Sequence, residues 1–156
     1  MTITVAKHSG YLAAAAAVSF TGTQTLASLG DGEWTNLSDE IDNSTNKYAL
    51  VDLYLDLASA AFTSSGVEIY LVPSVDGTTY PTWTGNVSTE EPENQTHFVG
   101  SMNTTESTAV QDTILRNVVL PPGKYKWGVR NQTGIAFAAS GNTLYWRPHS
   151  LAGDDS

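Results

Sequence analysis

The sequence contains no cysteine, few basic residues and no long apolar run. Without cysteine, the chain has neither a disulfide framework nor a thiolate metal site. Its 7 lysines and arginines against 16 acids give a formal net charge of -9. Binding to phosphates or to anionic lipid needs a basic face, and the apolar stretch at 11–20 is too short to span a membrane. We therefore expect neither nucleic acid nor a membrane as a partner.

The sequence also lacks the short motifs that carry chemistry. Its histidines, His8, His97 and His149, are scattered and do not show the spacing of zinc ligands. There is no Gly-x-Ser-x-Gly elbow, and the glycines form no phosphate-binding loop. A Ser-His-Asp triad is assembled in space, so the sequence alone leaves it open. We expect no catalytic residue, no metal and no cofactor, and we predict that the protein is not an enzyme.

Two groups of acids offer functional alternatives. Asp52 and Asp56 share one face of a predicted strand, and paired carboxylates serve a glycan hydrolase when they flank a cleft. We favour cross-strand pairing of these acids with a base such as Lys124 or Lys126. The loop at 39–43 offers oxygen ligands for calcium, although its spacing differs from that of helical calcium sensors. We favour a loop capped by its own side chains. The loop acids and amide are Asp39, Glu40, Asp42 and Asn43.

Alternating apolar and polar residues predict strands in the middle of the chain. The segments 48–57, 67–72 and 124–130 each place apolar side chains on one face and polar side chains on the other. One face of each strand is therefore expected in a core and the other in water. The residues predicted to be buried are Val51, Leu53, Leu55, Ile69, Leu71, Trp127 and Val129, and those predicted to face outward are Asp52, Asp56, Lys124 and Lys126.

The remaining strands are expected at 23–27, 97–102, 108–120, 135–139 and 143–148. The turn at 63–66 predicts that segments 48–57 and 67–72 form a hairpin. Segment 108–120 places Ile114, Val118 and Leu120 on one face. About eight strands at this spacing predict an all-β fold, namely an antiparallel, jelly-roll-like β-sandwich.

The ends of the chain differ in composition from its middle. We divide the sequence into an extended N-terminal arm at 1–22, a β-sandwich domain at 23–149 and a flexible acidic tail at 150–156. The small side chains at 13–17 allow close backbone approach, which suits either an intersubunit seam or an edge strand of the same sandwich. Because the sequence starts at Met1, we expect synthesis in the cytoplasm without secretion.

Several aromatic residues lie in or near predicted turns: Trp34, Tyr80, Trp83, Tyr145 and Trp146. An exposed aromatic ring can stack on a sugar or anchor a protein interface, and a buried one covers an end of the core. Trp83 precedes an acidic loop. The residues predicted to form an interface are Tyr11, Leu12, Phe20, Trp83, Glu90 and Glu91.

Four segments give the chain a family likeness: 72–80 (VPSVDGTTY), 120–126 (LPPGKYK), 131–134 (NQTG) and 138–144 (AASGNTL). With these turn motifs, residues 26–148 resemble small β-sandwich virion proteins of tailed bacteriophages. Some members of that group are head decoration or cement proteins, and others belong to the neck or tail. The resemblance implies a structural, non-enzymatic role and transfers no catalytic residue.

From this resemblance we expect a head decoration (cement) protein on the virion surface. It would bridge subunits of the phage major capsid protein as a homotrimer and stabilise the assembled shell by mass action. The alternative is a carbohydrate- or receptor-binding β-sandwich module of the tail or neck, and a glycan hydrolase is a third possibility. Aromatic residues around a concave face beside acids would favour sugar binding. Aromatic residues and an arm buried against neighbours would favour cement.

Overall fold

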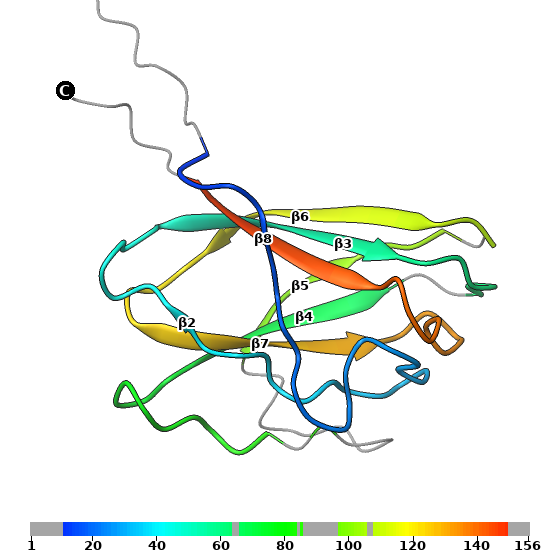
Figure 1. Cartoon of the computed structure of the whole chain (residues 1–156), viewed down its shortest axis with the longest axis horizontal. Coiled ribbons are helices and arrows are strands. Elements are labelled where there is room, and N and C mark those ends of the chain that lie inside the picture. Colours follow the sequence, from blue (N-terminus) through cyan, green and yellow to red (C-terminus); the bar gives the residue numbers. More distant parts are fainter. Residues whose placement is uncertain (1–10, 64–65, 84, 86–96, 106–107, 150–156) are drawn as a thin grey trace, which may run out of the picture.

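The computed structural model describes residues 11–63, 66–83, 85, 97–105 and 108–149. Residues 1–10 of the expected arm and the expected tail at 150–156 lie outside this range. Within the described residues, eight antiparallel strands form two four-stranded sheets that pack face to face (Figure 1). The strands are β1 (Ala16–Ala17), β2 (Ile41–Asp42), β3 (Leu50–Leu57), β4 (Val67–Pro73), β5 (Phe98–Met102), β6 (Gln111–Val119), β7 (Lys124–Asn131) and β8 (Thr143–His149).

The order of the strands is that of a jelly roll. One sheet has the order β1-β8-β3-β6 and the other the order β2-β7-β4-β5. The first strand pairs with the last, β2 with β7, β3 with β6, and β4 with β5. Rolling this antiparallel ribbon brings β8 beside β3 and β7 beside β4. The predicted fold class is therefore confirmed.

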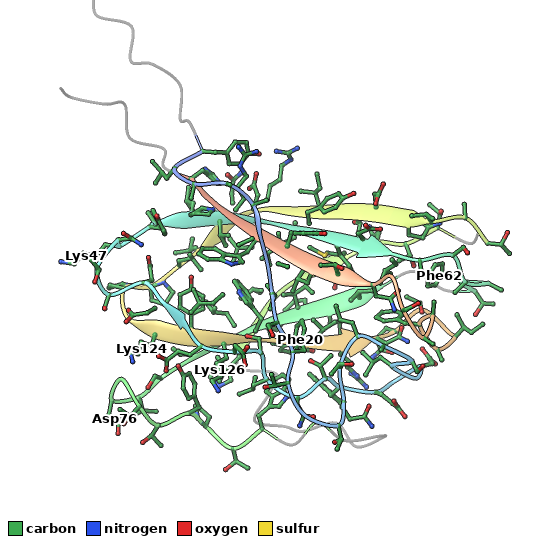
Figure 2. All side chains as sticks on the ribbon, in the orientation of Figure 1. Phe20, Lys47, Phe62, Asp76, Lys124 and Lys126 are labelled. Atoms are coloured by element: carbon green, nitrogen blue, oxygen red, sulfur yellow. The ribbon has the colours of Figure 1, made fainter. Side chains whose placement is uncertain are left out.

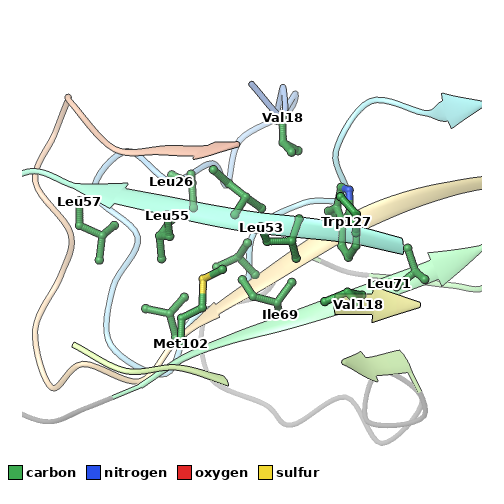
Figure 3. Close-up of a cluster of buried hydrophobic side chains, with 14 of the residues drawn as sticks. Val18, Leu26, Leu53, Leu55, Leu57, Ile69, Leu71, Met102, Val118 and Trp127 are labelled. Atoms are coloured by element: carbon green, nitrogen blue, oxygen red, sulfur yellow. The ribbon is translucent and has the colours of Figure 1, made fainter. Parts of the chain in front are cut away.

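The core lies between the two sheets, as the alternation predicted. The inward side chains of β3 interdigitate with those of β4 and β7 (Figure 3). The burial prediction is confirmed at every position, since all of its residues are at most 8% exposed: Val51, Leu53, Leu55, Ile69, Leu71, Trp127 and Val129. The four charged residues predicted to face outward alternate with these and are partly exposed.

The predicted hairpin between 48–57 and 67–72 is wrong. Strands β3 and β4 belong to different sheets, so the turn between them carries the chain from one layer to the other. The apolar faces of the two strands meet across the core instead of lying side by side. Either arrangement buries the same alternating residues, which is why alternation could not distinguish them.

The phase expected for segment 108–120 is also wrong, because β6 contains a β-bulge. Val51 lies opposite Val118, but Leu53 lies opposite Leu115, so one extra residue stands opposite Asp52. Side chains before the bulge therefore point to the opposite face from that expected. Ile114 is 47% exposed, whereas Val118 and Leu120 are buried.

The strands expected at 23–27 and 135–139 do not form. Both segments are loops whose apolar side chains enter the core: Leu26 and Phe137 are buried. The amide of Phe137 donates to the carbonyl of Leu29, so the two loops are joined. Their apolar residues are buried in the core, but the segments do not pair with a neighbouring strand as the pattern predicted.

Residues 11–20 run along the free edge of β8. The amide of Leu12 donates to the carbonyl of Pro148 and that of Val18 to Leu144, and Phe20 forms a bridge with Ser38 beside the other sheet. In Figure 1 this blue segment crosses from one layer to the other. Val18 is buried in the core. This part of the chain thus serves as an edge strand of its own sandwich.

The turn segments at 72–80, 131–134 and 138–144 build loops through side-chain hydrogen bonds. The carboxylate of Asp76 accepts the amide hydrogens of Thr79 (2.6 Å) and Thr78 (2.8 Å), which hold its pKa well below the ordinary value. Asn131 donates to the carbonyls of Leu29 and Ile135. These motifs therefore specify the loops of this fold. Among the described residues, no helix has the length and apolar character needed to cross a membrane.

Candidate binding face

The outer surface of β8, β3 and β6 is a candidate binding surface, called the open face below. In Figure 1 no described loop lies above β3 and β6, whereas several loops lie below β4 and β7. Alternation along each strand places polar and aromatic side chains on this outer surface. The side chains of the open face are Asp52, Tyr54, Asp56, Asp112, Ile114, Arg116, Thr143, Tyr145 and Arg147.

An apolar row crosses the middle of the open face. Tyr54 of β3 stands opposite Tyr145 of β8 on one side and Ile114 of β6 on the other. The two tyrosine rings are partly exposed, with centroids 6.0 Å apart and an angle of 43° between their planes. The β6 bulge is responsible for the outward position of Ile114. The row offers rings and an aliphatic side chain to a ligand or partner.

A groove of about 420 Å³ runs along this row. Its walls include Tyr11 and Ala15 from the N-terminal segment, and Arg147 and Asp56 lie toward its two ends. A second hollow of about 260 Å³ shares Tyr11 with it and is lined by His149. The volume of the larger groove is within the range typical of small-molecule sites.

Asp52 joins three elements at one end of the open face. Its Oδ1 accepts the amide hydrogen of Asn117 at the bulge (2.9 Å) and lies 3.1 Å from His149 Nε2. Its Oδ2 accepts from the Tyr11 hydroxyl (3.1 Å) and from Arg116 (3.3 Å). The carboxylate therefore compensates the unpaired amide of the bulge and attaches the N-terminal segment to the sheet. We interpret it as structural.

No sequence pattern predicts the contacts of His149 and Arg116 with Asp52. These residues are separated from Asp52 by 97 and 64 positions, and the contacts depend on the pairing of β3 with β8 and on the bulge. Arg147 lies in the same corner. Its guanidinium carbon is 3.6 Å from the centre of the Tyr11 ring, and its Nε donates to the carbonyl of Ala13.

The other end of the open face is acidic. Asp56 of β3 and Asp112 of β6 are direct cross-strand partners, so their carboxylates lie on the same face. The Tyr54 hydroxyl donates to Asp112 (2.6 Å), and this hydrogen bond to a carboxylate raises the pKa of Tyr54 to about 12. On its other side Asp56 stands opposite Thr143.

The predicted pairing of Asp52 and Asp56 with Lys124 or Lys126 is wrong. Both lysines belong to β7 in the other sheet, on its side away from β3 (Figure 2). Lys124 forms a salt bridge with Glu40 (2.8 Å), which lowers the pKa of that carboxyl. The ammonium group of Lys126 lies 4.9 Å from the centre of the Tyr80 ring.

The loop considered for calcium uses its polar side chains for its own hydrogen bonds. Asn43 pairs with the backbone of Tyr48 in both directions and donates to the carbonyl of Pro121. Asp42 accepts the amide hydrogen of Ser44 (2.8 Å). Within the described part of the chain, no group of three or more His, Asp or Glu side chains is arranged to hold a metal ion.

On the outer surface of the second sheet, called the covered face below, the chain itself buries Trp34 and Tyr70, while Phe98 of β5 is 48% exposed. The ring centroids of Trp34 and Tyr70 are 4.7 Å apart, and Trp83 packs against both at 5.4 and 5.7 Å. The indole of Trp83 donates to the carbonyl of Thr35 (2.7 Å). It also lies over Gly128, where a Cβ atom would be only 2.3 Å from the ring.

The predicted interface residues occupy different places. Tyr11 lines the groove, and Leu12 beside it is 51% exposed. Phe20 packs partly buried at the edge between the sheets, and Trp83 lies in the covered face. Glu90 and Glu91 lie outside the described residues. Of the aromatic residues near turns, only Tyr145 joins the row of the open face, and Trp146 packs against the core.

Comparison with models of protein families, with curated proteins and with solved structures finds no match to this chain. An assignment of function therefore depends on the candidate binding face and on the likeness in the turn motifs.

Proposed function

We propose that this protein is a non-enzymatic structural protein of a tailed-bacteriophage virion, a head decoration protein that docks on the major capsid protein through its open face. The observation that carries the proposal is the contrast between the two outer surfaces. On one sheet, loops of the same chain bury the rings of Trp34 and Tyr70, while the other sheet presents a row of partly exposed apolar side chains across its three strands β8, β3 and β6. An apolar row left open on an otherwise well-packed sandwich is typical of an interaction surface.

Three further features support this role. The turn motifs resemble those of small virion proteins. The jelly roll also occurs in viral capsid domains, although a fold alone does not establish a function. The net charge of -9 suits a basic partner surface. A decoration protein that binds only the assembled shell stabilises that state by mass action, and a trimer would repeat the contact around a three-fold axis.

Sedimentation with empty phage heads that lack this protein tests the proposal. We expect the wild-type chain to sediment with the heads and to raise the temperature at which they break open. Ile114→Thr on the open face should weaken binding. Val75→Thr is the matched control, because Val75 is an exposed aliphatic residue beyond β4, outside the open face. Failure of the wild-type chain to bind heads would contradict the proposal, as would equal loss in both variants.

A second candidate function is a carbohydrate- or receptor-binding module of the tail or neck. It is favoured by the pair of tyrosine rings in a groove beside acids, because rings of this kind stack on sugars. Titration with a panel of neutral mono- and disaccharides, followed by the NMR signals of Tyr54 and Tyr145, tests it. Localisation of the protein on virions by electron microscopy would distinguish head from tail.

A further inference from the structure

We propose that the acidic end of the open-face groove receives a lysine or arginine side chain of the partner protein, whose cation lies between the Asp56 and Asp112 carboxylates and packs on the ring of Tyr54. This inference rests on the proposed docking function, because it specifies the chemistry of the surface that the open face contacts. It is carried by charge complementarity and by a comparison with the other aromatic clusters of the same molecule.

The first observation is the pairing of like charges. Asp56 and Asp112 are direct partners on neighbouring strands, and both side chains are on the open face. Carboxylates in this position repel each other and destabilise the sheet. An asparagine in place of either aspartate would remove this repulsion. Retention of both acids is understandable if a cation from outside is placed between them.

The second observation concerns the nearest bases. Arg116 is bound to Asp52 (3.3 Å), and Arg147 is stacked on Tyr11 and bonded to Ala13 at the opposite end of the groove. The residues that the structure describes show no salt bridge to Asp56 or Asp112. The groove thus has a compensated end at Asp52 and an uncompensated, acidic end at Asp56.

The third observation is that other clusters of aromatic and acidic residues in this protein already contain a cation. On the covered face, Arg130 lies 4.9 Å from the Trp34 ring centre and 3.5 Å from the Glu68 carboxylate. At the far end of that sheet, Lys124 pairs with Glu40, whose carboxylate also accepts the Tyr80 hydroxyl.

The site at Tyr54 combines an aromatic ring and a carboxylate in the same way as these two clusters, because the Tyr54 hydroxyl donates a hydrogen bond to Asp112. It differs in that its rings are partly exposed and no described side chain supplies the cation. A guanidinium or ammonium group is therefore the ligand chemistry that this end of the groove fits best, since it gains both ion pairs and a cation–π contact.

The first test uses the isolated, full-length protein and a small probe. Nα-acetyl-arginine methylamide should shift the NMR signals of Tyr54 and Tyr145, and the neutral citrulline analogue should not. The double variant Asp56→Asn/Asp112→Asn should abolish the shift. The control Asp39→Asn replaces an exposed acid before β2 and should leave the shift unchanged.

A comparable shift with the citrulline analogue would overturn the proposal. So would a response to a neutral disaccharide without any response to the arginine probe, which would assign the groove to a glycan. The proposal would also be overturned if the arginine probe shifted these signals in the Lys7→Gln variant but not in the wild-type chain. That result would mean that a lysine of the same chain occupies the groove in the wild-type protein.

The second test uses empty heads. Each of Asp56→Asn and Asp112→Asn should weaken binding about three- to tenfold, with a smaller loss at high salt, and Asp39→Asn should have no effect. Asp56→Asn should also raise the melting temperature of the free protein by about 1–3 °C, because the repulsion is removed and, among the described residues, no hydrogen bond of the Asp56 side chain is lost. Unchanged head binding by the double variant would overturn the proposal. If the wild-type chain does not bind heads but the arginine probe still requires both acids, the docking function fails while the cation site stands.

Discussion

On the covered face, Trp34 and Tyr70 are at most 3% exposed and Trp83 packs against both, whereas on the open face Tyr54 and Tyr145 both stay partly exposed. The difference arises from a glycine within β7 and from the loops. Gly128 leaves room for an indole against the covered face. On the open face, the N-terminal segment borders the row through Tyr11 and Ala15 but leaves its rings partly exposed.

The comparison shows that one sandwich can use aromatic residues for two purposes. On the covered face they form a second hydrophobic layer outside the sheet and stabilise the fold by burial. On the open face the same residue types contribute little to folding and remain available for contact. The faces also differ in one charged pair: Arg130 on the covered face is paired with Glu68, whereas Asp56 on the open face stands opposite another acid.

The largest expected effect is the loss of a ring from the covered face. Trp34 is fully buried, so Trp34→Ala should lower the free energy of unfolding by about 3–5 kcal/mol. Tyr145→Ala on the open face should cost about 1 kcal/mol or less, in the range of a cross-strand surface pair. Urea denaturation measures both. Equal losses would show that the two faces do not differ as described.

The next effect concerns the close approach of Trp83 to Gly128. Gly128→Ala places a methyl group in contact with the indole ring and should destabilise the protein by about 1–3 kcal/mol. In a Trp83→Ala background the same substitution should cost much less, which a double-mutant cycle would detect. The same cost in both backgrounds would mean that the indole is not the cause.

A third experiment compares two acids on the open face itself. Asp52→Ala removes the acceptor of the bulge amide of Asn117 and should cost about 1–3 kcal/mol. Asp56→Ala should cost nothing or stabilise the protein slightly, because it removes a like-charge pair. Thermal unfolding of the two variants checks this contrast. A larger loss for Asp56→Ala would refute the assignment of Asp52 as the structural carboxylate.

The smallest expected effect is a shift in the titration of Tyr54. Its pKa is raised to about 12 because the hydroxyl donates to Asp112. A raised pKa in the folded state means that this contribution to stability is complete below about pH 10, the ordinary tyrosine value, and is lost as the pH rises toward 12. Asp112→Asn should lower the pKa of Tyr54, as followed by the ultraviolet absorbance of tyrosinate with Tyr54→Phe as the reference. An unchanged titration would contradict the assigned hydrogen bond.

Much of the fold could be predicted because alternation has a direct physical cause. Leu53 and Leu55 are apolar at every second position, and only burial of one strand face satisfies that pattern. The sandwich class follows from the repetition of this pattern between turns, although the strands expected at 23–27 and 135–139 are loops and the short strands β1 and β2 were not predicted. The hairpin of β3 with β4 was wrong because apolar alternation reports which face is buried, but not which strand lies beside it.

The candidate site could be predicted only in part. Tyr11 was among the predicted interface residues and Tyr145 among the aromatic residues near turns, but nothing in the sequence connected them with Tyr54. Their meeting depends on the antiparallel register of β3 with β8, and the outward turn of Ile114 depends on the bulge at Arg116 and Asn117. Neither register nor bulge leaves a local pattern that can be separated from ordinary alternation.

The sequence by itself therefore determined the strands β3 to β8, the identity of most core residues and the turn segments that Asp76, Asn131 and Asn142 cap, because these depend on local chain geometry and on burial of one face. Only the tertiary structure decided which sheet each strand joined, which face its loops covered and which carboxylates met. Those features depend on contacts between residues far apart in the chain, whose pairing is selected by the packing of the whole sandwich.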